Sequence, residues 1–126
     1  MPPGAWLALS ANFLDQAPDA GRFGVVCKVT SRNGSVETVE RRAFDFDLTS
    51  GRYQNKGTGV VKPLQSYDEN QLTMSRNFER NSTDVETLNR VTGEYLLKLW
   101  GYGADILVKG NCEKVPYQGM EVQKKF

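Results

Sequence analysis

Apolar and polar residues alternate with a period of two along several stretches of this chain, and that alternation limits the fold more than any other feature. In a β-strand, successive side chains point to opposite faces, so the pattern predicts strands with one buried face. The residues expected on buried faces are Phe23, Val25, Cys27 and Val29, then Phe44, Phe46 and Leu48, then Tyr95, Leu97 and Leu99, and last Ile106, Val108, Gly110 and Cys112.

Short turn signals separate these strands. Asn33-Gly34 accepts positive φ at both residues and is a strong hairpin signal. Thr92-Gly93 and Gly101-Tyr102-Gly103 mark two further turns. We therefore predict an all-β fold, a small antiparallel meander that either closes as a barrel or folds as a sandwich. The 126 residues fit a single β domain, which we place at residues 23–126.

The segment 71–78 fits two patterns. The alternation of Leu72, Met74 and Phe78 with polar neighbours predicts a strand, whereas the wider spacing from Leu64 to Phe78 also fits a helical face. Because the surrounding chain is rich in strand signals, we predict a strand here. Pro63, just before it, is expected at an edge, a bulge or a strand end.

Residues 1–22 form an N-terminal segment with a short apolar run, Ala5–Ala11. Two interpretations remain open. The run is either a remnant of a secretory signal, although no basic residue precedes it, or a short helix with Trp6, Leu9 and Phe13 on one face. No stretch of the chain approaches the roughly 20 apolar residues of a membrane span.

The chain contains no histidine and only two cysteines. Histidine is the commonest general base and a common metal ligand, so its absence excludes Ser-His and Cys-His nucleophiles. Two cysteines without a CxxC motif do not make a zinc site. The sequence therefore predicts no metal site, no cofactor and no recognisable catalytic residue. Sixteen basic and fifteen acidic residues give a net charge of +1, which argues against a nucleic-acid partner.

Two acidic pairs are the remaining candidates for catalysis. Asp45 and Asp47 lie on the same face of one predicted strand, and Asp68-Glu69 lies in a predicted turn. Glycosidase-type hydrolysis needs two carboxylates that face each other across a cleft. Neighbours on one strand face are more typical of a solvated surface, so we expect a surface role and keep a carboxylate-based hydrolase as a remote alternative.

Cys27 and Cys112 lie on the apolar faces of the first and last clear strands. In a closed meander the first and last strands are neighbours, which would bring the two sulfurs within reach of each other. An exported protein is expected to carry a disulfide here, and a cytosolic one two buried thiols. The presence of a disulfide would therefore indicate both that the meander closes and that the protein is exported.

The stretch TLNRVTGEY at 87–95 is followed by KGNCEK at 109–114. This part of the chain resembles the C-terminal end of small exported bacterial β-proteins of uncharacterised function, in which an INRxTGxY turn precedes a strand ending GxCE. Weaker support comes from FDFDL at 44–48 and from Arg52-Tyr53. The resemblance implies a β-rich fold and a periplasmic or secreted location, and no activity. Members often carry further cysteines near Arg52-Tyr53, which this chain lacks, so no shared disulfide pattern is implied.

The candidate binding residues are Arg90, Tyr95, Trp100 and Tyr102. Arg90 suits bidentate anion binding, although a cross-strand ion pair with Glu94 or Glu86 is the expected role. Tyr95 is placed to cap the core. Trp100 and Tyr102 flank a turn and suit a contact platform, although we expect Trp100 to close one end of a barrel.

These patterns favour a non-enzymatic interaction or ligand-binding module with an unidentified protein or small-molecule partner. The alternative is a structural or assembly subunit, such as an envelope or virion component, whose strand edges contact copies of itself. The expected location is periplasmic or secreted, with the cytoplasm as the alternative. The sequence leaves the oligomeric state open.

Overall fold

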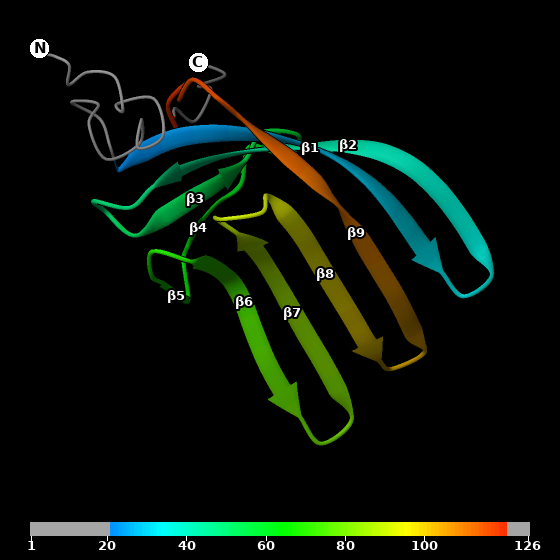
Figure 1. Ribbon diagram of the computed structural model, residues 1–126. Helices are drawn as coiled ribbons and strands as arrows, with labels where there is room; N and C mark the ends of the chain where they lie inside the picture. The colour runs from blue at the N-terminus through cyan, green and yellow to red at the C-terminus, as the bar shows by residue number, and fades with distance from the viewer. Residues whose placement is uncertain (1–20, 121–126) are drawn as a thin grey trace, which may run out of the picture.

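A computed structural model describes residues 21–120, which form nine strands and no helix. The strands curl into one half-barrel sheet (Figure 1). Their bounds are β1 Arg22–Asn33, β2 Val36–Asp47, β3 Arg52–Asn55, β4 Val61–Pro63, β5 Ser66–Tyr67, β6 Gln71–Glu79, β7 Ser82–Asn89, β8 Glu94–Gly101 and β9 Ala104–Val115. The predicted all-β meander is confirmed, and the ambiguous segment 71–78 is a strand. The predicted signal remnant or helix at the N-terminus falls almost wholly on residues 1–20, outside the described residues.

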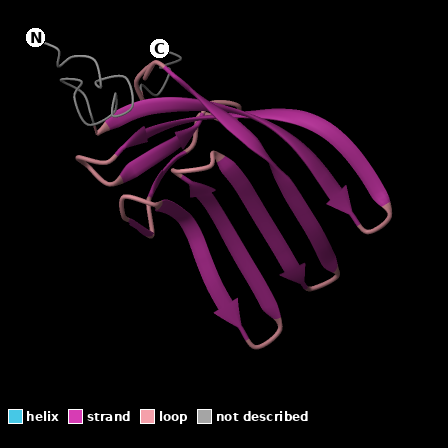
Figure 2. Cartoon of the chain, viewed as in Figure 1, coloured by secondary structure: helices cyan, strands magenta, loops and turns pink. Residues whose placement is uncertain are grey.

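All strand pairs are antiparallel, and the sheet order is β4-β3-β2-β1-β9-β8-β7-β6-β5. Strands joined by short turns are therefore neighbours, as Figure 2 shows. The first strand also pairs with the last one, as the closed meander requires. The hairpin between β1 and β2 forms as predicted, but its two turn residues are Gly34 and Ser35, because Asn33 pairs with Val36. Gly34 has φ 62°, and glycine at the first turn position is typical of such a hairpin. The expected positive φ at Asn33 is therefore wrong.

The two edge strands of the sheet, β4 and β5, are consecutive in the chain. Leu64, between them, donates its backbone N–H to the carbonyl of Gly51, and Gln65 donates to the carbonyl of Thr73. This short stretch thus bonds to the β3 side and to β6, and it closes the barrel at one end. Towards the other end, β2 and β6 have no further strand between them among residues 21–120, so the seam is open.

The core fills the closed end of the half-barrel. Aromatic rings from neighbouring strands dominate it: Phe44 lies 5.6 Å from Tyr95 and Phe23 lies 5.4 Å from Phe46, between ring centroids. The buried apolar residues are Phe23, Val25, Cys27, Val29, Phe44, Phe46, Tyr53, Leu72, Met74, Leu88, Tyr95 and Val108. Most of them belong to the faces that the alternation predicted, because the pleat holds that alternation along each strand.

Gly110 on β9 allows β1 and β9 to approach closely. It lies opposite Val29 on β1 and opposite Tyr95 on β8. A Cβ atom at this position would lie 2.1 Å from the carbonyl oxygen of Lys28, which is far inside van der Waals contact. Any larger residue would therefore push the two strands apart beside the buried Tyr95 ring.

Candidate functional site

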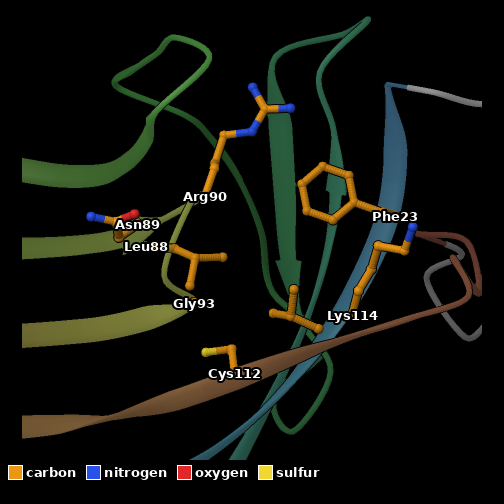
Figure 3. Close-up of a pocket in the computed structure, with 8 residues that line it drawn as sticks. Phe23, Leu88, Asn89, Arg90, Gly93, Cys112 and Lys114 are labelled. Carbon is orange, nitrogen blue, oxygen red and sulfur yellow. The ribbon is translucent and has the colours of Figure 1, made fainter. Parts of the chain in front are cut away.

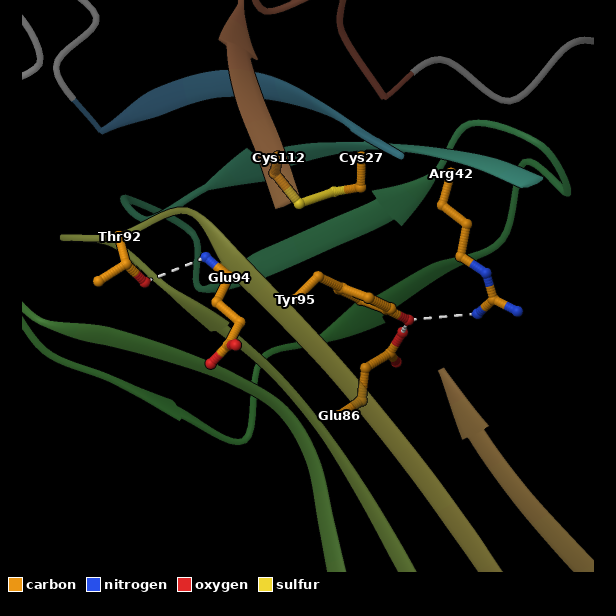
Figure 4. Close-up of a disulfide and its surroundings, with 7 residues drawn as sticks. All are labelled: Cys27, Arg42, Glu86, Thr92, Glu94, Tyr95 and Cys112. Carbon is orange, nitrogen blue, oxygen red and sulfur yellow. Dashed lines mark hydrogen bonds between the residues drawn. A yellow bond between two sulfur atoms is a disulfide. The ribbon is translucent and has the colours of Figure 1, made fainter. Parts of the chain in front are cut away.

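Three polar side chains meet on the concave face of the half-barrel. Arg42 on β2 donates from Nη1 to the hydroxyl of Tyr95 on β8, over 3.2 Å. The Tyr95 hydroxyl in turn donates to Oε2 of Glu86 on β7. Figure 4 shows this chain of hydrogen bonds beside the Cys27–Cys112 disulfide. Arg42 also forms an ion pair with Glu40, 3.5 Å between Nη2 and Oε1.

The register explains why these groups share one face. Glu86 lies opposite the inward-facing Leu97, and Tyr95 lies opposite the inward-facing Leu88. Arg42 lies opposite Cys27, whose side chain also points inward. The curl of the sheet then brings β2 over β7 and β8, although they are not adjacent in the sheet.

Burial sets the protonation of this chain. It raises the pKa of the Glu86 carboxyl, and the hydrogen bond from Tyr95 and the nearby Arg42 offset that rise only in part. Burial also raises the pKa of Tyr95, and the adjacent Glu86 carboxylate raises it further. Tyr95 is therefore a neutral donor that holds Glu86 in place.

A cavity of about 250 Å³ lies beside Glu86. It is lined by Phe44, Tyr53, Asn55, Thr58, Val60, Lys62 and Glu86. Two aromatic side chains, Phe44 and Tyr53, supply apolar wall, and Glu86 and Lys62 supply opposite charges. The arrangement combines apolar surface with a few polar groups, which is typical of small-molecule sites.

The Tyr53 hydroxyl is an unused polar group in this cavity. The residue is only 5% exposed, and its hydroxyl has no hydrogen-bond partner among residues 21–120. No fully buried side-chain nitrogen or oxygen in the described chain lacks a partner, so this hydroxyl reaches accessible space. Burial raises the pKa of Tyr53 to about 12, with contributions from the Glu86 and Asp84 carboxylates. It is a neutral donor available to a ligand.

A second, smaller cavity of about 100 Å³ lies near the turn between β7 and β8 (Figure 3). Its lining residues are Phe23, Val25, Leu88, Asn89, Arg90, Gly93, Cys112 and Lys114. The Arg90 guanidinium lies 6.0 Å from the centroid of the Phe23 ring, within the range of a cation–π contact. This cavity holds the Arg90 that the sequence predicted as a binding residue, but not Trp100 or Tyr102.

Arg90 has a different partner from the one expected. Its Nη1 donates to the backbone carbonyl of Asp68 over 2.7 Å, and within the described residues no ion pair joins it to Glu86 or Glu94. The predicted cross-strand ion pair is therefore wrong. The reason is that Glu86 points to the concave face, where Tyr95 binds it, while Arg90 lies beyond the end of β7 in the turn.

Trp100 does not close the barrel. It lies on the outer face of β8, opposite Asp105, and is 51% exposed. Tyr102 is 83% exposed and has φ 52° in the turn between β8 and β9. The prediction of a lid is wrong because the alternation of β8 turns Tyr95 inward and Trp100 outward. Both aromatic residues remain available as a surface platform.

Asp45 and Asp47 are buried, which corrects the expected solvated surface. The C-terminal segment contacts Asp45 through the backbone N–H of Gln118, and Lys56 pairs with Asp45 at 3.2 Å. Asp47 forms an ion pair with Arg22 at 3.4 Å. Asp47 accepts hydrogen bonds from the backbone N–H groups of Thr49 and Ser50. Both carboxylates thus support local structure, and they do not face each other across a cleft.

Asp68 also has a local role, since it accepts hydrogen bonds from the backbone N–H groups of Asn70 and Gln71. Those bonds hold the pKa of Asp68 below its ordinary value. No group of three or more metal-ligating side chains occurs within residues 21–120. The same residues contain no helix with the length and hydrophobicity needed to cross a membrane.

Sequence reasoning missed Tyr53, Lys62 and Glu86 as site residues. Glu86 carried a usable signal, because it lies two residues before Leu88 and so shares the inward face of a predicted strand. A charged residue on an apolar face indicates either a buried partner or a site. Tyr53 and Lys62 carried no such signal, since their strands are short.

Comparison with protein-family models, with curated proteins and with solved structures finds no match to this chain. The resemblance of residues 87–114 to exported bacterial β-proteins therefore stays a prediction.

Proposed function

We propose that this protein is a non-enzymatic ligand-binding module whose site is the concave cavity beside Glu86. Its ligand is a small molecule with an apolar body and an ammonium group. The Glu86 carboxylate carries the proposal: it lies in an aromatic-walled cavity and is held by the Tyr95 hydroxyl. A partly buried carboxylate favours groups of opposite charge, and an ammonium group would add one to the nearby Arg42 and Lys62.

The charges around the cavity favour a cation. Arg42 already has Glu40 as its acidic partner. The ionisable groups on this part of the concave face are Glu40, Arg42, Lys62, Asp84 and Glu86, so three acids and two bases leave a net charge of −1. Phe44 and Tyr53 add ring faces that attract an ammonium group, and the Tyr53 hydroxyl adds a hydrogen-bonding group.

Titration of the protein with phenethylammonium, phenethyl alcohol and phenylacetate tests the proposal, because these probes share one apolar body and differ in charge. We expect phenethylammonium to bind about tenfold more tightly than the alcohol, the usual worth of one charge-assisted hydrogen bond. Its binding should shift amide resonances of Tyr53, Lys62 and Glu86. Phenylacetate should bind most weakly.

Glu86→Gln keeps an acceptor for Tyr95 but removes the charge, so it should erase the preference for phenethylammonium over the alcohol. Glu113→Gln, at an exposed position on the outer face of β9, is the matched control and should change neither affinity. Equal affinity for all three probes, or an unchanged preference in Glu86→Gln, would contradict the proposed site.

A periplasmic or secreted location accompanies this proposal. Support comes from the disulfide between Cys27 and Cys112, because such bonds persist in oxidising compartments. Maleimide labelling in intact cells checks it: an exported protein should present no reactive thiols without prior reduction. Full labelling would instead indicate the cytoplasm.

The alternative function, an assembly subunit, is favoured by one observation. The outer part of β2 has an unpaired edge, and Val36 and Val39 are 63% and 70% exposed there. Exposed strand edges of this kind promote pairing with another chain.

A further inference from the structure

Along the free edge of β2, three residues have backbone hydrogen-bonding groups that no residue in 21–120 pairs with. β3 pairs only with Phe44–Asp47, and the Lys56 N–H takes the carbonyl of Ala43. Backbone groups alternate in direction along an antiparallel strand. The N–H and C=O groups of Arg41, Val39 and Glu37 therefore point the same way as those of Ala43, into the open seam.

The opposite edge of the seam is protected. β6 has a register shift between Thr73 and Ser75, and such bulges discourage pairing with another chain. Its Arg76 N–H is already bonded to the side-chain oxygen of Gln65. In contrast, the outer part of β2 has no proline and pairs with β1 without a register shift.

The free edge of β2 is complementary to itself. If two copies pair antiparallel about Val39, each Glu37 lies opposite Arg41 of the other copy, on the outer face. On the inner face Thr38 lies opposite Glu40, so no like charges meet. Val39, which is 70% exposed, then lies opposite its own copy, and the two residues exchange both backbone hydrogen bonds.

Arg41 also lacks an acidic partner among the residues that the structure describes. Its cross-strand neighbour on β1 is Lys28, a like charge, and Arg41 forms no ion pair with any residue in 21–120. Like charges directly opposite each other are destabilising. Glu37 of a second copy would supply the missing acid.

We infer that two copies of this chain associate through their β2 edges, in the register that pairs Val39 with Val39 about a two-fold axis. This isologous contact joins the two half-barrels into one continuous sheet. A hollow beside Ala43 and Lys56 leaves room for the β1–β2 turn of the second copy. The inference is independent of the ligand proposal, because it uses the outer edge and not the concave cavity.

Charge exchange at Glu37 and Arg41 tests this register. Glu37→Lys places two lysines opposite two arginines, and Arg41→Glu places two pairs of glutamates opposite each other. Each single variant should therefore dimerise roughly tenfold more weakly than the unmodified chain. An equimolar mixture of the two variants restores both pairs, Lys with Glu and Arg with Glu, so it should associate at least as tightly as the unmodified chain.

Sedimentation velocity of the full chain over a range of concentrations measures both effects. The matched controls are Glu113→Lys and Lys98→Glu, which make the same charge changes at exposed positions of β9 and β8, in the interior of the sheet. They should leave the dissociation constant unchanged. Amide exchange at Glu37, Val39 and Arg41 should slow as the protein concentration rises.

Three outcomes would overturn the inference. The unmodified chain stays monomeric at the highest concentration, the single variants associate as well as the unmodified chain, or their mixture fails to regain association. The second outcome would place any dimer contact on another surface, such as the exposed Trp100 and Tyr102.

Discussion

Cys27 and Cys112 lie directly opposite each other on β1 and β9, and their disulfide joins the first strand of the meander to the last. The Cys112 N–H bonds to the carbonyl of Gly93 on the other side of β9. The two cysteines therefore occupy a non-hydrogen-bonded pair, in which side chains approach most closely. The bridge cross-links β1 and β9 at the centre of the sheet, where no turn connects the two strands.

Replacing both cysteines, Cys27→Ala with Cys112→Ala, should lower the free energy of unfolding by about 4.5 kcal/mol. The bond spans 85 residues of sequence, and the chain-entropy estimate for a loop of that length gives this magnitude. Urea unfolding measures the loss. Dithiothreitol should destabilise the unmodified chain by a similar amount and leave the double variant unchanged. An equal response of both proteins would mean that the bridge contributes nothing to stability.

Tyr95→Phe should destabilise the protein by about 1–3 kcal/mol, because it leaves Glu86 and Arg42 without the hydroxyl that connects them. The ring itself is retained, so the packing against Phe44 survives. Tyr102→Phe removes a hydroxyl from an exposed residue and should have no measurable effect. Similar stabilities for the two variants would show that the hydrogen-bond chain is energetically neutral.

The raised pKa of Glu86 makes stability depend on pH. The unfolded chain ionises this group near its ordinary value of 4.5, whereas the folded protein retains the proton to higher pH. The folded state then binds more protons, so the Glu86 contribution to stability falls as pH rises above about 4.5. It is constant again once pH exceeds the raised pKa.

Glu86→Gln removes this titration, so the stability of the variant relative to the unmodified chain should rise with pH across that window. Urea unfolding at a series of pH values measures the difference. The free energy of unfolding of the control Glu113→Gln should depend on pH in the same way as that of the unmodified chain. A pH-independent difference for Glu86→Gln would indicate that the carboxyl titrates normally in the folded protein.

Gly110→Ala should cost about 3 kcal/mol or more, because the new methyl group would collide with the backbone of Lys28. The collision can be relieved only if β1 and β9 move apart. Gly57→Ala is the matched control, since its Cβ would approach only the side-chain oxygen of Asn55, at 3.2 Å. Thermal unfolding compares the two. A mild effect at Gly110 would show that the two strands separate easily.

Much of the fold was predictable from local pattern. The alternation at 23–29 and 44–48 depends on residues close together in the chain and appears as predicted. The hairpin signal was also local, although the turn itself falls one residue later, at Gly34-Ser35. The adjacency of Cys27 and Cys112 followed from one further assumption, that the meander closes. Two predictions about faces were wrong. Trp100 points outward. Asp45 and Asp47 are buried, and Asp45 is bonded by the C-terminal segment, which no pattern within its own strand could indicate.

The sequence by itself determined the strands, the turns and the absence of histidine chemistry, because these depend on neighbouring residues and on composition. The tertiary structure alone decided where the cavity lies and which strand edge stays open. Glu86, Tyr95 and Arg42 meet only because the sheet curls, bringing β2 over β7 and β8. Within residues 21–120, the outer edge of β2 is free because β3 is short. Cys27 and Cys112 depend on both the sequence pattern and the tertiary structure. The alternation places each side chain on the inner face, and the pairing of the first strand with the last brings the two sulfurs together.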